Sequence, residues 1–141
     1  MFGFFGAKAS AEKLAKSASQ ALRAQALSAP GVVRDGEALD SQTLAHHTCN
    51  DWVLGYILGF AISTATRAGL VDDKARTRFV EDVIHGMFNR HLGEMLMDRM
   101  GKAALRPEGT FHDGWNTASG DVASERPLKA RSLGRYLARA T

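Results

Sequence analysis

The sequence predicts an all-α protein with a long antiparallel helical hairpin at the centre of a small helical bundle, an irregular C-terminal region and a short terminal helix. Three observations support this fold class. Apolar residues recur every three or four residues within 72–100, which is typical of an amphipathic helix. Asp72 provides a good N-cap. Gly69 and Gly101 stand where glycines commonly end helices. At 141 residues, we expect the chain to form one domain, 1–141, with one core.

The N-terminal part, residues 1–29, is expected to be a peripheral basic helix. Ser10 can cap this helix, which would continue to about Ser28 before the sequence Ala-Pro-Gly breaks it. Its apolar stripe consists mainly of alanine and leucine and is narrow, so the helix should pack on the outside of the body. Residues 30–40 are predicted to form a loop.

Residues 41–100 should form the central hairpin. Its first arm, 41–68, would be capped by Ser41 or Asp40, and its second arm would be 72–100. The connection between the arms is so short that they must pair antiparallel, each about 40 Å long at a rise of 1.5 Å per residue. This register places Gly59 near 82–84 and Asp51 near His91. We interpret Asp51 and His91 as a buried structural pair in preference to a catalytic dyad.

The C-terminal region, residues 102–141, is basic and is predicted to be irregular because glycines interrupt any helical period. Phe111 and Trp115 should anchor it to the body. A short helix is expected from Pro127 to Ala140, with Leu133 and Tyr136 toward the core. The opposite side of this helix would form a basic ridge of Lys129, Arg131, Arg135 and Arg139.

Self-association is the preferred functional hypothesis. Gly55 and Gly59 form a small-residue face that allows another helix to approach closely, either the second arm or a second copy of the chain. The broad apolar stripe of the second arm offers more surface than one chain can cover. A homodimer, or a complex with another protein, should therefore form through the glycine face and through Phe88 and Met95.

Metal binding by a helical bundle or a small-ligand enzyme is one alternative. His46, Cys49, His91 and Glu94 lie near the open end of the predicted hairpin and include ligand types that transition metals accept. They lack the paired Cys-x-x-Cys spacing of structural zinc and the two Glu-x-x-His motifs of di-iron bundles. No cofactor is therefore predicted. The sequence also shows no catalytic signature, so a non-enzymatic interaction domain is favoured over an enzyme.

The charge distribution suggests a second alternative. Residues 1–29 carry a net charge of +3, residues 30–101 carry −3, and residues 102–141 carry +3. Basic ends of this kind could contact nucleic acid or an anionic membrane surface, although no named binding motif is present. The single cysteine suits a reducing compartment, and the 15 uncharged residues 52–66 are fewer than the roughly 20 that span a bilayer. A cytoplasmic location is expected.

Overall fold

The computed structural model describes residues 4–27, 50–106, 109–124, 132–133 and 135–136 of the chain. Five helices carry labels in this part of the chain, and it contains no strand. They are α1 (Phe4–Leu27), α3 (Asp51–Arg67), α4 (Asp73–Met87), α5 (Arg90–Ala104) and α6 (Phe111–Ala123). The predicted all-α class and the small helical bundle are confirmed.

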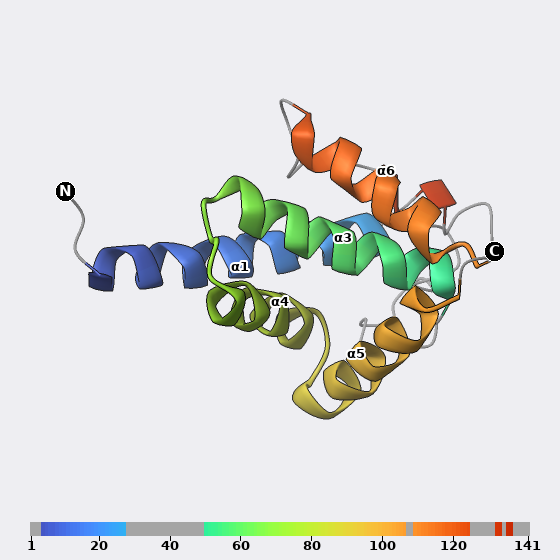
Figure 1. Ribbon diagram of the computed structural model, residues 1–141, viewed down its shortest axis with the longest axis horizontal. Coiled ribbons are helices and arrows are strands. Elements are labelled where there is room, and N and C mark those ends of the chain that lie inside the picture. The colour runs from blue at the N-terminus through green and yellow to red at the C-terminus, as the bar shows by residue number, and fades with distance from the viewer. Residues whose placement is uncertain (1–3, 28–49, 107–108, 125–131, 134, 137–141) are drawn as a thin grey trace.

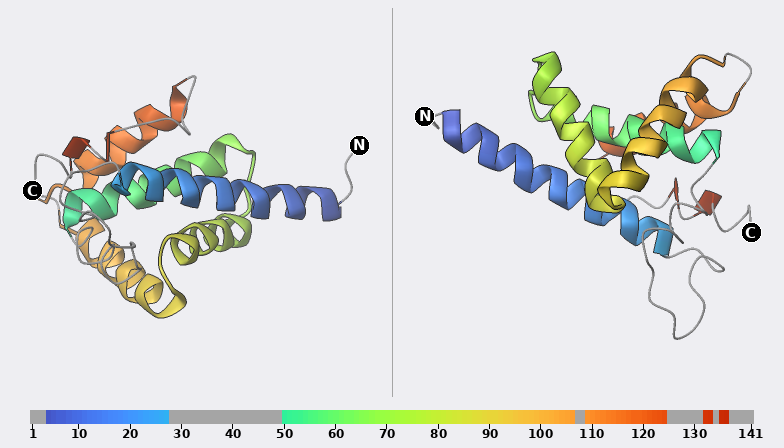
Figure 2. Two further views of the ribbon diagram at one scale, coloured as in Figure 1. Left: turned by 180° about the vertical axis from the view of Figure 1, so that it is seen from behind. Right: turned by 90° about the horizontal axis from the view of Figure 1, so that it is seen from below.

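Helix α3 lies at the centre of the arrangement (Figure 1). Helix α6 packs along one side of α3, while α4 and α5 lie on another side. Helix α1 crosses behind α3 and α4, and its N-terminal end extends past the other helices (Figure 2). The expected N-terminal helix therefore exists, but it begins at Phe4, before the predicted cap at Ser10.

Helix α1 packs against α4 through buried alanines and also forms hydrogen bonds with it. The Ser19 hydroxyl donates a hydrogen bond to the Val83 carbonyl at 3.1 Å. The Arg23 guanidinium donates to the carbonyl of Met87, the last residue of α4. Ala15 and Ala18 are fully covered, because small side chains let the two helices approach closely.

The central position of α3 agrees with its apolar sequence, but its start differs from the prediction. Asn50 has an extended backbone, and its side-chain oxygen accepts a hydrogen bond of 2.9 Å from the amide of Val53. Asparagine is favoured at this capping position because its side chain satisfies a free backbone donor. A continuous helix 41–68 capped by Ser41 or Asp40 was therefore wrong, and residues 41–49 lie outside the described part of the chain.

The turn between α3 and α4 matches the sequence prediction. Gly69 has a φ of +83°, and its amide bonds to the Thr66 carbonyl at 3.0 Å while the amide of Leu70 bonds to the Ala65 carbonyl at 3.0 Å. These paired bonds form a Schellman motif, which needs the left-handed conformation that glycine adopts at little cost. The Asp72 carboxylate then caps α4 by accepting from the Ala75 amide at 3.4 Å.

The predicted second arm 72–100 is interrupted, which corrects the picture of two long matched arms. Phe88 is extended and buried, with only 2% of its surface exposed. The next residue, Asn89, caps a new helix by accepting a hydrogen bond from the Leu92 amide at 2.8 Å. Gly101, expected to follow the arm, lies inside α5. The chain turns at this point because Asn89 caps a second helix while the Phe88 ring enters the core.

The C-terminal region is more helical than the sequence predicted. Residues 102–104 complete α5 and residues 111–123 form α6, so the expected irregular structure is wrong there. Phe111 is 1% exposed and Trp115 packs against the core, which confirms both anchors. Of the predicted helix from Pro127 to Ala140, the structure describes residues 132, 133, 135 and 136, and all four are helical.

Candidate interaction surface

An apolar groove opens between α3, α4 and α5. Its floor consists of Leu58 and Ile62 from α3, Val80 from α4 and Met97 from α5, and its volume is about 390 Å³. The edge of the groove consists of four polar or charged residues of α4, namely Asp73, Arg76, Thr77 and Glu81. The groove thus combines an apolar floor with charges of both signs along one side.

Helix spacing and the break at Asn89 explain how these residues come together. Leu58 and Ile62 are four residues apart and therefore lie one above the other on α3. The residues of α4 at the groove include two pairs with the same spacing, Arg76 with Val80 and Thr77 with Glu81. Since the chain turns between α4 and α5, Met97 of α5 comes to lie at the same groove as α3 and α4.

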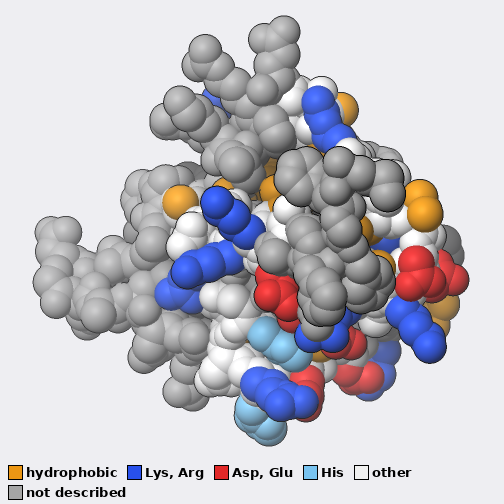
Figure 3. All heavy atoms as spheres, turned by 90° about the vertical axis from the view of Figure 1, so that its left-hand side faces the viewer, with side chains coloured by type: hydrophobic (Ala, Val, Ile, Leu, Met, Phe, Trp, Pro, Cys, Tyr) orange, Lys and Arg blue, Asp and Glu red, His pale blue; other side chains and the backbone are white. Residues whose placement is uncertain are grey.

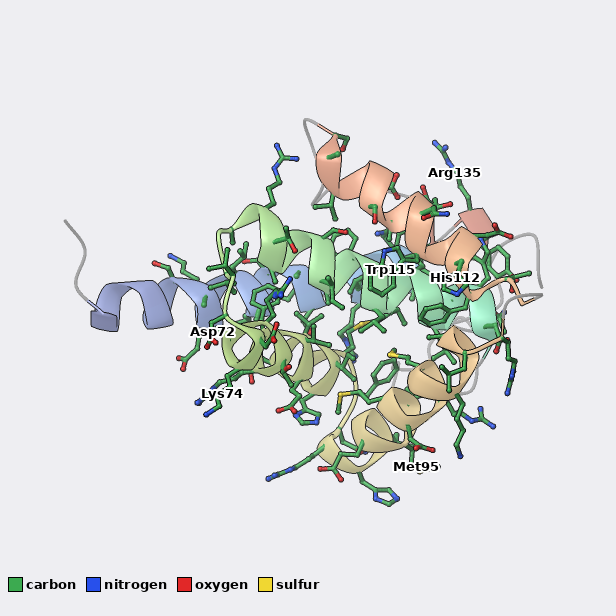
Figure 4. All side chains as sticks on the ribbon, viewed as in Figure 1. Asp72, Lys74, Met95, His112, Trp115 and Arg135 are labelled. Carbon is green, nitrogen blue, oxygen red and sulfur yellow. The ribbon has the colours of Figure 1, made fainter. Side chains whose placement is uncertain are left out.

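The outward face of α4 is charged. A broad open hollow of about 710 Å³ is lined by the following residues: Asp73, Lys74, Thr77, Arg78, Glu81, Asp82, His85 and Arg90. Along α4, Asp73 comes first, and Lys74 and Arg78 precede Glu81 and Asp82; the Lys74 side chain points away from the bundle (Figure 4). Figure 3, which looks at the left-hand side of Figure 1, shows charged side chains of both signs beside histidine in its lower half. Within the described residues, no ion pair joins Lys74, Arg78, Glu81 or Asp82 to another side chain.

His85 lies at the corner between α4 and α5. Its ring stands against Gly93, where an added Cβ would lie 2.8 Å from the His85 Cδ2 atom. The Nε2 atom is buried and has no hydrogen-bond partner among the described residues. A side chain at position 93 would therefore displace the His85 ring.

Helix α6 occupies the predicted glycine face of α3. A Cβ at Gly59 would lie 2.9 Å from the Trp115 Cα atom, and one at Gly55 would lie 2.7 Å from the Phe111 carbonyl carbon. Farther along, the Ser63 and Ser119 hydroxyls are 3.0 Å apart and share a hydrogen bond. The close partner of this face is therefore α6, which corrects the expectation that a second hairpin arm or a second copy would supply it.

The two other predicted interaction residues differ from each other in exposure. Phe88 is buried within the chain's own core. Met95 is 53% exposed and points outward from α5 (Figure 4). Met95 is therefore accessible, whereas Phe88 is covered by this chain.

The predicted pairing of Asp51 with His91 is wrong. Asp51 instead forms an ion pair with Arg106, at 3.1 Å between the carboxylate and the guanidinium. Because α5 starts afresh at Arg90, the register assumed for a continuous second arm does not apply, and His91 is exposed.

The structure does not assemble the proposed metal ligands. Glu94 is exposed and lies 3.5 Å from Arg90. His46 and Cys49 lie outside the described residues. Within the described ranges, no group of three or more His, Cys, Asp or Glu side chains could hold a metal ion.

Of the four residues of the predicted basic ridge, the structure describes only Arg135. Arg135 is exposed and points away from the bundle (Figure 4), while Lys129, Arg131 and Arg139 lie outside the described residues. Leu133 and Tyr136, which were expected to face the core, do so in the structure. Leu133 is fully buried, and the Tyr136 ring stacks on Trp52 with 4.1 Å between ring centroids.

A polar network at Tyr56 joins the C-terminal segment to the body. The Tyr56 hydroxyl donates to the Asp121 carboxylate at 2.6 Å and receives a hydrogen bond of 3.1 Å from the Gln25 amide. The Gln25 oxygen in turn accepts from the Leu133 amide at 3.0 Å. Burial raises the pKa of the Tyr56 hydroxyl far above its usual value, and the hydrogen bond to Asp121 raises this pKa further. The hydroxyl thus stays protonated and serves as a structural donor.

Sequence reasoning identified parts of the groove without assembling it. Val80 belonged to the predicted apolar stripe, and the predicted hairpin already placed α3 beside α4, but Met97 could join the groove only once the chain turned at Asn89. The helices of the described part are also too short or too polar to cross a membrane. No family model matches this chain, and no curated protein or solved structure matches it either.

Proposed function

We propose that this chain is a helical interaction domain that works by binding protein and that it associates with itself as a dimer. The observation that carries this proposal is the apolar groove of Leu58, Ile62, Val80 and Met97. An apolar floor beside a polar edge has the composition of a protein–protein interface, in which burial at the centre provides the driving force.

The floor of the groove keeps contact with solvent. Leu58, Ile62 and Met97 are only partly buried by their own chain, so a partner can remove further apolar surface from water. Removing apolar surface from water is favourable by about 25 cal/mol for each Å², before the entropic and desolvation costs of association are subtracted. A symmetric dimer would bury the same surface on both copies and gain this contribution twice.

Light scattering over a dilution series tests the proposal. We expect a dimer at micromolar concentration and a falling mean mass on dilution. Met97→Asp should lower the dimer fraction because it places a carboxylate on the groove floor. Met95→Asp on the same helix distinguishes this groove from the Met95 surface that the sequence predicted, since side chains two residues apart do not face the same side; it should leave the dimer fraction unchanged if the groove is the contact. A monomer at every concentration would overturn the proposed function.

A further inference from the structure

We infer that the partner in the groove is a second copy of this chain, packed with its α4 antiparallel to the first α4, so that Arg76 of each copy faces Glu81 of the other. This inference rests on the proposed function, because it names the face and the register of the self-association. It follows from the order of residues along the edge of the groove.

Two opposite charges stand at the edge of the groove. Arg76 and Glu81 both line the groove. The Arg76 side chain is 38% exposed and is held at the edge by Asp73, with 2.9 Å between the charged atoms. Glu81 is exposed and forms no ion pair within the described part of the chain. One groove edge therefore presents a positioned guanidinium and an unpaired carboxylate.

These two charges define a register for two antiparallel copies of α4. When two copies of α4 run antiparallel with Arg76 opposite Glu81, Thr77 of each copy lies opposite Val80 of the other. A two-fold axis repeats each contact. The centre of the interface then holds two contacts between Thr77 and Val80, with one ion pair between Arg76 and Glu81 on each side of them. Leu58, Ile62 and Met97 lie beside this centre and would be covered by the second copy.

A parallel arrangement of two copies of α4 is disfavoured by charge. A parallel two-fold pairing would bring Arg76 next to Arg76 and Glu81 next to Glu81, and such like charges repel each other. The placement of Arg76 before Glu81 along the groove edge thus favours an antiparallel partner with the same sequence.

The ion pairs mainly set the register, whereas the apolar floor provides the affinity. Arg76 and Glu81 stand at the rim and keep contact with water, where such pairs contribute little net stability. Reversing one charge has a larger effect because it creates two repulsive contacts in a symmetric dimer.

Sedimentation velocity on charge-reversal variants tests the inference. Arg76→Glu and Glu81→Arg should each raise the dimer dissociation constant about tenfold or more, and the double variant Arg76→Glu/Glu81→Arg should restore dimer formation. The variants at Arg76 also lose the ion pair between Arg76 and Asp73 within α4. Asp73→Asn removes that ion pair alone and is the control; it should leave the dimer fraction nearly unchanged. Circular dichroism should show the same helix content in all four variants.

The outcomes separate this inference from the proposed function. If the wild-type chain stays monomeric at every concentration, both fail. If the wild-type chain forms a dimer that neither single reversal weakens, the α4 register is overturned while self-association stands. If both reversals weaken the dimer and the double variant does not recover, Arg76 and Glu81 do not face each other.

Discussion

Gly55 of α3 lies directly against the backbone of Phe111 in α6, where an added Cβ would stand 2.7 Å from the Phe111 carbonyl carbon. The relationship is reciprocal, because a Cβ at Gly114 of α6 would stand 2.9 Å from the carbonyl carbon of Trp52 in α3. The two helices therefore approach backbone to backbone through glycines on both sides. This contact fixes α6 on α3 and leaves Leu58 and Ile62 at the groove on the adjoining side.

We expect Gly55→Ala to lower the free energy of unfolding by about 1–3 kcal/mol, because the added methyl group must force backbone atoms apart. The matched control is Gly120→Ala in α6, where an added Cβ meets nothing within 4 Å. This control should stabilise the protein by about 0.5–1 kcal/mol, since alanine favours the helix. Urea unfolding measures both changes. If the two substitutions changed the free energy of unfolding equally, the close contact between α3 and α6 would be contradicted.

The cap at Asn89 gives a second prediction. Asn89→Ala removes the acceptor of the Leu92 amide and should cost about 0.5–2 kcal/mol of stability. Asn116→Ala, at an exposed position inside α6, is the control and should be neutral or slightly stabilising. Thermal unfolding followed by circular dichroism distinguishes them. If Asn89→Ala proved as stable as the wild type, the break between α4 and α5 would not depend on this cap.

Tyr56 should make stability fall at alkaline pH. Because burial, and next the bond to Asp121, raise the pKa of the folded hydroxyl, only the unfolded chain releases this proton near pH 10. The contribution of Tyr56 is thus complete below about pH 10 and is lost as the pH rises above that value. Tyr56→Phe should cost about 1–3 kcal/mol at neutral pH through its lost hydrogen bonds.

Urea unfolding at several pH values checks this expectation. The stability difference between the wild type and Tyr56→Phe should shrink as the pH rises above about 10, because phenylalanine has no proton to release. Tyr136→Phe is the control, since Tyr136 lies partly exposed at the surface. A difference that stays constant across this range would show that the Tyr56 hydroxyl is not held protonated by the fold.

Local signals in the sequence predicted the parts of the fold that depend on local chemistry. The helical character of the uncharged stretch 52–66, the Gly69 turn and the Asp72 cap follow from short-range rules, and the structure contains all three. Helix α6 was missed because its glycines weaken the helical pattern in isolation. At Gly114 the packing against Trp52 outweighs that weak propensity, and this contact connects residues far apart in the sequence.

The break at Asn89 explains why the groove could not be predicted. The apolar period continues from Phe79 through Met95 as though one helix ran through, yet Asn89 caps a new helix. A single asparagine has two readings, as an unfavourable interior residue or as a cap, and the apolar pattern favoured the first. Once the chain turns there, Met97 joins Leu58 and Val80 on one surface.

The central claim is that two copies pair through α4 with Arg76 facing Glu81 of the other copy, and mixing the two single charge-reversal variants tests it most directly. Arg76→Glu carries two acidic residues at the contact and Glu81→Arg carries two basic ones, so each variant alone should sediment mainly as a monomer at a concentration where the wild type is a dimer. An equimolar mixture should form a heterodimer, because each reversed charge then meets its opposite on the other copy. If the mixture sediments as the sum of two monomers while the wild type is a dimer, the antiparallel α4 pairing is contradicted.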